Sequence, residues 1–223
     1  MHSVPHRELV TLAVPSGQVE GLLALPAKAR GMILFAHGSG SSRHSPRNNA
    51  VASVLRSAAF GTLLMDLLTP GEDHDTAARF DIDLLVARLA LAADRLATHP
   101  ATTGLPLGLF GASTGAASAL RLAALRRDAV GAVVARGGRP DLAGKQALSQ
   151  VRAPTLLIVG TLDTEVLALN RQAAASLRCV HHLETVAGAT HLFEERGALD
   201  IVAGLAARWF VRHLTAREEG GAT

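Results

Sequence analysis

Short apolar runs alternate with longer mixed segments along most of this chain. The runs have the length of strands, and because they are continuous rather than alternating, they predict strands buried on both faces. Segments of helical length separate them, which is typical of parallel strands joined by crossover helices. We place six such strands, at 31–36, 62–66, 105–110, 130–135, 155–159 and 181–186.

The first part of the chain predicts a different element. Two apolar runs, 9–14 and 19–25, are separated by the segment 15–18, whose proline and glycine favour a turn. We therefore expect an antiparallel hairpin before the parallel strands. Helices are expected between the strands and after the last one, at 47–59, 78–98, 114–126, 163–177 and 199–214.

The composition fits one domain spanning 1–223. A length of 223 residues suits a single open sheet, which the pattern predicts to be doubly wound. Hydrophobic residues make up 48% of the chain and charged residues 18%, a balance that can fill one core and argues against disorder. The acid-rich segment 69–84 is expected as an exposed connection at the C-terminal edge of a strand, and the polar end 215–223 as a frayed tail.

Charge and residue usage disfavour several classes of function. The formal net charge is only +3, the basic residues are spread along the chain, and there is no tyrosine, so nucleic-acid binding is disfavoured. The lone cysteine, Cys179, allows no internal disulfide and fits a reducing compartment. No apolar stretch approaches the ~20 residues of a membrane span, and the first residues lack the apolar part of a signal peptide. We expect a soluble cytoplasmic protein, monomeric or homodimeric, that does not bind membranes.

A candidate nucleophile lies where a predicted strand meets a predicted helix. Gly111-Ala-Ser113-Thr-Gly115 matches G-x-S-x-G and stands between the apolar run 105–110 and an alanine-rich segment. A turn this tight strains its central residue and exposes the serine hydroxyl at the start of the helix. An ordinary strand-to-helix turn explains the pentapeptide alone equally well, but the flanking strand and helix favour a nucleophilic Ser113.

A serine nucleophile needs a base and a group that orients the base. Asp163 follows a predicted strand, where its carboxylate can reach the neighbouring loop; a helix N-cap is its other possible role. Of the ten histidines, only His191 and His213 follow the last predicted strand, and His213 falls inside the terminal helix. The order serine, acid, histidine predicts the triad Ser113, Asp163 and His191.

A glycine-rich segment, 37–42, directly follows the strand 31–36. Such a turn can aim backbone N–H groups at the oxyanion of a tetrahedral intermediate, and we assign those of Ser39 and Thr114 as donors. A phosphate-binding loop is the alternative, which is disfavoured because neither G-x-x-x-x-G-K-[ST] nor G-x-G-x-x-G occurs. Histidines with the spacings H-x-x-x-H or H-E-x-x-H are also missing near this edge, so we expect no catalytic metal and no cofactor.

Together these segments resemble the α/β-hydrolase superfamily, and within it the small members similar to dienelactone hydrolases. The segments that carry the resemblance are 35–43, 111–115, 135–141, 160–163 and 188–191. The resemblance implies an eight-stranded, mostly parallel sheet without a large cap, and hydrolysis through an acyl-enzyme. Dienelactone hydrolases proper use a cysteine where this chain has Ser113, so a carboxylesterase acting on small soluble esters is the expected activity.

Other functions remain open at this point. A binding protein could keep the fold without hydrolysis, and the same nucleophile could serve an acyltransferase or a phosphotriesterase. Arg43, Arg136 and Arg139 could present cationic side chains near the pocket. The preferred interpretation of these arginines is a surface position beside a flexible turn.

Overall fold

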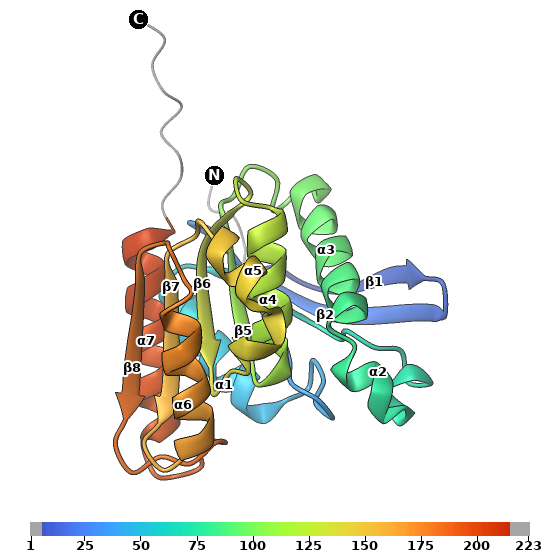
Figure 1. Ribbon diagram of the computed structural model, residues 1–223. Helices are drawn as coiled ribbons and strands as arrows, with labels where there is room; N and C mark the ends of the chain where they lie inside the picture. Colours follow the sequence, from blue (N-terminus) through green and yellow to red (C-terminus); the bar gives the residue numbers. More distant parts are fainter. Residues whose placement is uncertain (1–5, 215–223) are drawn as a thin grey trace, which may run out of the picture.

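The computed structural model describes residues 6–214, which form one eight-stranded sheet of order β1-β2-β4-β3-β5-β6-β7-β8 (Figure 1). β2 is antiparallel to both β1 and β4, and every other neighbouring pair is parallel. The predicted hairpin and mostly parallel sheet are therefore confirmed. The strands are β1 His6–Val14, β2 Gly17–Leu25, β3 Met32–Ala36, β4 Gly61–Met65, β5 Leu107–Ala112, β6 Val130–Arg136, β7 Thr155–Gly160 and β8 His181–Val186.

Helices cover both faces of the sheet, as predicted (Figure 1). One face packs against α1 (Pro46–Ser57) and α7 (Ala198–His213), which also contact each other. The other face packs against α3, α4, α5 and α6, whose bounds are Ile82–Thr98, Thr114–Leu125, Lys145–Gln150 and Thr164–Ala174. Three shorter elements complete the described chain: the 3-10 turns η1 (Glu72–His74) and η2 (Pro140–Ala143), and the helix α2 (Thr76–Phe80).

The central strands are buried on both faces, which explains their continuous apolar sequence. Successive residues of a strand point to opposite faces of the sheet. In β3, Met32 and Leu34 join the cluster under α3 and α4, while Ile33 and Phe35 join the cluster under α1 and α7. One sheet thus separates two apolar layers.

The segment 78–98, expected as one helix, is divided in the structure. Asp81 has extended backbone between α2 and α3, and its carboxylate accepts the N–H of Leu84 at 3.0 Å. Asp75 caps α2 in the same way through the N–H of Ala77. Aspartate is among the most favourable N-cap residues, so two acidic residues of this connection start helices. The expectation of an uninterrupted helix was wrong because the capping signal was not recognised.

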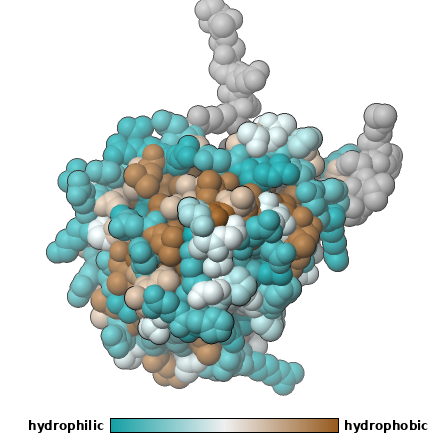
Figure 2. Space-filling view, turned by 90° about the vertical axis from the view of Figure 1, so that its right-hand side faces the viewer, coloured by the Kyte–Doolittle hydropathy of each residue, from teal (hydrophilic) through white to brown (hydrophobic). Residues whose placement is uncertain are grey.

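The connection between β4 and α3, with η1 and α2, is a small addition to the sheet edge rather than a large cap. On the side of the molecule that carries β1, α2 and α3, apolar side chains lie scattered among polar ones (Figure 2). Within residues 6–214, no helix combines the length and apolar character needed to cross a membrane. The predicted frayed tail, 215–223, lies outside the described residues.

Candidate active site

Ser113 occupies a strained turn between β5 and α4. Its backbone has φ 51° and ψ −123°, a conformation that costs a non-glycine residue about 1–3 kcal/mol. The flanking glycines are required by space: a Cβ on Gly115 would lie 2.2 Å from the carbonyl oxygen of Ala36, and one on Gly111 would lie 2.5 Å from Cα of Ala116. The G-x-S-x-G pattern therefore satisfies a packing constraint that holds the serine at the edge of the sheet.

Asp163 and His191 are joined directly. Oδ2 of Asp163 accepts a hydrogen bond from Nδ1 of His191 at 2.6 Å, and the carboxylate is the more buried partner, at 13% exposure against 37%. Asp163 stands at the start of α6, yet its side chain makes no capping hydrogen bond there. A Cβ on Gly160 would lie 2.2 Å from the carbonyl oxygen of Ala189, so a glycine at the end of β7 lets the two loops approach. With Nδ1 bonded to the carboxylate, Nε2 is the nitrogen left to act as a base.

The loop after β6 touches both Ser113 and His191. The N–H of Ser113 donates to the carbonyl of Arg136 at 3.2 Å, and the carbonyl of Ser113 accepts the N–H of Arg139 at 3.0 Å. Between these residues, a Cβ on Gly137 would lie 3.6 Å from Cε1 of His191. Within residues 6–214 no hydrogen bond joins Oγ of Ser113 to the imidazole, a contact that often tightens only when substrate is bound.

The two predicted oxyanion donors contact each other. The N–H of Ser39 donates to Oγ1 of Thr114 at 2.9 Å, so this N–H is already engaged. The N–H of Thr114 belongs to the first turn of α4, where the helix itself supplies no acceptor and the helix dipole favours negative charge. A Cβ on Gly38 would lie 2.8 Å from Cβ of Ser113, so the glycine-rich loop lies directly against the serine.

His37 ties this loop to the chain beyond β4. Its Nε2 accepts the N–H of Leu67 at 3.0 Å, so the ring proton is on Nδ1, which donates to the carbonyl of Gly38 at 2.9 Å. The ring is buried, and this burial lowers the pKa of His37, more than the nearby carboxylates raise it. No role was predicted for His37 beyond its place at the start of the glycine-rich segment. It directly follows the fully buried strand β3, and this was the signal available in the sequence for its burial.

Arg136 is buried, which contradicts its interpretation as a surface arginine. Its side chain is 7% exposed and lies 5.9 Å from the ring centroid of Phe193, two residues after His191. Nη2 donates to Oδ1 of Asn48 at 3.3 Å, whereas Nε and Nη1 have no partner among the described residues. Burial, with a smaller contribution from Arg47, lowers the pKa of Arg136 to about 10. Arg136 is the last residue of β6, a strand buried on both faces, so its place directly after the apolar run 130–135 was the signal for its burial.

The other two arginines that the sequence singled out are held by carboxylates. Arg43 forms ion pairs with Asp66 and Glu20, and Arg139 forms a bidentate pair with Asp141 in its own loop. The side chains of Arg43 and Arg139 are about one fifth and one third exposed, respectively. Neither arginine carries an unpaired charge toward Ser113.

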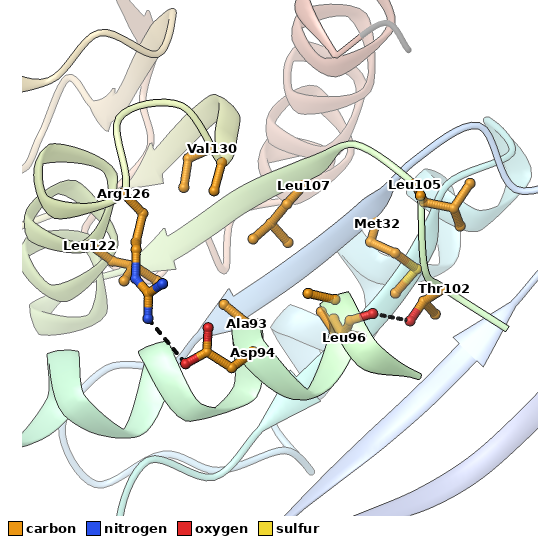
Figure 3. Close-up of a pocket in the computed structure, with 13 residues that line it drawn as sticks. Met32, Ala93, Asp94, Leu96, Thr102, Leu105, Leu107, Leu122, Arg126 and Val130 are labelled. Atoms are coloured by element: carbon orange, nitrogen blue, oxygen red, sulfur yellow. Dashed lines mark hydrogen bonds and ion pairs between the residues drawn. The ribbon is translucent and has the colours of Figure 1, made fainter. Parts of the chain in front are cut away.

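Two hollows differ in their relation to the predicted site. A small one of ≈180 Å³ lies between the glycine-rich loop and the β4–α3 connection, lined by Ser39, Gly40, Asp73, Arg79 and Thr114 among others. A larger one, with ≈770 Å³ of empty space, lies between α3 and α4, at the ends of the strands opposite Ser113 and His191 (Figure 3). None of Ser113, Asp163 and His191 lines either hollow, although the first is lined by the predicted oxyanion donors Ser39 and Thr114. Asp94 and Arg126 form an ion pair at 3.0 Å across the second hollow.

Comparison with solved structures places the fold beside hydrolases. The dienelactone hydrolase of Anabaena variabilis is 50% identical, with a TM-score of 0.90 over 94% of this chain and 99% of that one. Carboxyl esterase 2 of the fungus Tuber melanosporum is 17% identical, with a TM-score of 0.72 over 94% of this chain and 88% of that one. The first likeness extends to sequence, and the second concerns the fold alone.

Two curated relatives come from the CDC 1551 and H37Rv strains of Mycobacterium tuberculosis. Each is 58% identical over 196 residues, and both bear the provisional name of phosphoribosyl transferase. The match spans 88% of this chain but only 44% of each relative. No family model matches the chain.

Proposed function

Because this chain belongs to the dienelactone hydrolase-like group of the α/β-hydrolase superfamily, we propose that it is a serine hydrolase that cleaves small carboxylic esters. The observation that carries this proposal is the 2.6 Å hydrogen bond between Asp163 and His191, beside the strained turn of Ser113. That bond fixes the tautomer of the imidazole, so that Nε2 has a lone pair for the serine proton.

In the first half of the reaction, Oγ of Ser113 attacks the carbonyl carbon of the ester and Nε2 of His191 takes the hydroxyl proton. Asp163 stabilises the imidazolium that forms. The oxyanion of the tetrahedral intermediate accepts the N–H of Thr114 and a second N–H from the glycine-rich loop, which Ser39 can supply if it releases Oγ1 of Thr114. His191 then returns the proton to the leaving alcohol, and an acyl group remains on Ser113.

In the second half, water replaces the alcohol. His191 takes a proton from the water, whose oxygen attacks the acyl carbon, and the same donors hold the second oxyanion. Collapse of this intermediate breaks the bond to Oγ, and the proton passes from His191 back to Ser113. The products are a carboxylic acid and the free enzyme. An alcohol acceptor in place of water would make the reaction acyl transfer.

The proposal favours small substrates. The space beside the glycine-rich loop is narrow, with ≈180 Å³ of empty space against ≈770 Å³ in the hollow between α3 and α4, and Arg79 of α2 lines it: a Cβ on Gly40 would be 3.7 Å from Nη1 of Arg79. A phosphoribosyl transferase activity is not carried over from the longer relatives, because this chain matches 44% of their length.

The direct test is hydrolysis of p-nitrophenyl acetate and butyrate by the wild type and by Ser113→Ala. Because the nucleophile is removed, we expect kcat to fall by about 10⁴-fold or more. Asp163→Asn should cost a similar factor, since the imidazole would adopt the wrong tautomer.

Ser149→Ala is the matched control, because Ser149 lies on α5 and donates only to the carbonyl of Gln146. It should keep the wild-type rate. Equal rates for wild type and Ser113→Ala would remove Ser113 from the mechanism and leave an inert binding protein as the better account.

A further inference from the structure

Three metal-binding side chains meet at the end of the fold opposite the triad. His6 and Glu8 lie two residues apart on β1 and project from the same face, and His99 directly follows α3. Oε2 of Glu8 lies 2.9 Å from Nε2 of His6 and 3.1 Å from Nε2 of His99. All three ligand atoms lie within 4.8 Å of one another, and in the described part of the chain this is the one such group of three.

We propose that His6, Glu8 and His99 form a Zn²⁺ site that ties the outer strand β1 to the C-terminal end of α3. Zinc takes imidazole nitrogen and carboxylate oxygen at about 2.0–2.2 Å in a tetrahedron, which separates neighbouring ligand atoms by about 3.3 Å. The two separations from Oε2 of Glu8 are close to that value, and the two imidazole nitrogens lie within 4.8 Å of each other, so side-chain rotations can bring the three atoms to tetrahedral spacing. Magnesium and calcium are excluded as the preferred ions because they favour oxygen ligands.

The burial of the three side chains suits a site that opens to solvent on one side. His99 is 8% exposed, whereas Glu8 and His6 are 33% and 44% exposed. The buried imidazole provides a fixed ligand, and the two strand residues face the route by which the ion enters. Three protein ligands leave the fourth position for a water molecule.

A zinc ion can bind Nε2 of His99 only if the proton on that nitrogen moves. Nδ1 of His99 accepts the N–H of Ala101 at 3.1 Å, so its ring proton is on Nε2 and points to Glu8. Zinc on Nε2 moves that proton to Nδ1, and the N–H of Ala101 loses its acceptor. Ala101 is exposed, so water can replace this single bond. The loss is small beside the three bonds that the metal forms.

The site has a structural consequence for the edge of the sheet. β1 pairs only with β2 and is the outermost strand, whereas α3 packs against the centre of the sheet. A metal ion held by both elements fixes the start of β1 to the body of the fold. The role is independent of the proposed hydrolysis, because none of its ligands touches the triad.

The test is binding of Zn²⁺ to the full chain in the Ser113→Ala background, measured by calorimetry and by competition with Co²⁺, whose visible absorption reports tetrahedral nitrogen and oxygen ligands. We expect a tetrahedral Co²⁺ spectrum that zinc abolishes, and a Tm that rises with zinc. His99→Gln, His6→Gln and Glu8→Gln should each weaken binding by about tenfold or more, since even indirect partners of a metal contribute this much.

A matched control exists on β8, where Nε2 of His182 lies 3.1 Å from Oε1 of Glu184 in the same H-x-E spacing. Among the described residues this pair has no third metal-binding partner, so His182→Gln should leave the affinity and the Tm increment unchanged. Conservative glutamine variants keep a polar side chain, and their circular dichroism spectra confirm folding. The proposal is overturned if wild type binds no zinc, or if His99→Gln binds it as tightly as His182→Gln does.

Discussion

At the scale of single residues, the site depends on groups that cannot be exchanged for similar ones. Glycine is required at positions 115 and 160 because a Cβ at either would lie 2.2 Å from a backbone oxygen. His37 must be neutral, because its Nε2 accepts a backbone N–H while Nδ1 donates. Protonation of Nε2 would abolish the first of these bonds and release the glycine-rich loop from Leu67.

The buried neutral His37 predicts a loss of stability in mild acid. Its pKa in the folded protein lies below the value of about 6.5 that it has when unfolded. The contribution of the neutral His37 to the free energy of unfolding is therefore complete above about pH 6.5. It is lost as the pH falls from there through the folded pKa, because in that range only the unfolded chain takes up the proton. We expect His37→Gln, measured by Tm between pH 8 and pH 5, to show a shallower acid loss than wild type.

The exposed His181 provides the control for this measurement. His181→Gln should retain the full acid dependence of the wild type. If the three proteins lose Tm in parallel, His37 does not couple proton uptake to unfolding.

At the scale of elements, a largely buried ion pair fixes the β4–α3 connection beside the proposed active site. Arg88 of α3 donates to Oε1 of Glu72 in η1 at 2.7 Å and to Oγ of Ser16 in the β1–β2 turn at 3.1 Å. Thr69 donates its N–H to the other oxygen of Glu72 at 2.8 Å. Burial raises the pKa of Glu72, but the hydrogen bonds from Ser16, Thr69 and Arg88 together lower it. One carboxylate therefore joins three elements.

Arg88→Met is expected to destabilise the protein by about 3 kcal/mol, because it leaves a largely buried carboxylate without its cation. The same change should raise KM for p-nitrophenyl esters more than it lowers kcat, since the loosened connection carries Asp73 and Arg79 over the hollow. Urea unfolding and steady-state kinetics measure both effects.

Arg126→Met removes an ion pair with Asp94 that is about half exposed on both sides. Such pairs contribute about 0–1 kcal/mol, so this variant should remain close to wild type. Equal destabilisation by Arg88→Met and Arg126→Met would contradict a fixing role for Glu72.

At the scale of the whole molecule, the sequence predicted elements that are long and strongly patterned. The central strands differ from their predicted bounds by one or two residues, because burial on both faces leaves an unmistakable apolar run. Strand β8 is found at its predicted bounds but is largely exposed, so the expectation that it is buried on both faces was wrong. The short helix α5 and the turns η1 and η2 were missed, since three to six residues carry too little periodicity.

The proximity of Asp163 and His191 followed from their places after neighbouring strands, β7 and β8. The cluster of His6 and His99, 93 positions apart, had no such signal, because it joins a strand to a helix end.

One sheet with apolar layers on both faces predicts a single cooperative unfolding transition. The one tryptophan of the chain, Trp209, donates to the carbonyl of Pro154 and reports on α7 and the start of β7. We expect its fluorescence and the far-ultraviolet circular dichroism to change at the same urea concentration. Separated midpoints would show that the chain contains more than one folding unit.

In the proposed mechanism, Ser113 is activated by His191, which Asp163 orients. The most direct measurement is mass spectrometry of the intact protein after reaction with a fluorophosphonate, followed by peptide mapping. We expect one adduct per chain, on Ser113, formed far more slowly in His191→Gln. A wild-type protein that stays unlabelled, or a His191→Gln variant that labels at the wild-type rate, would contradict it.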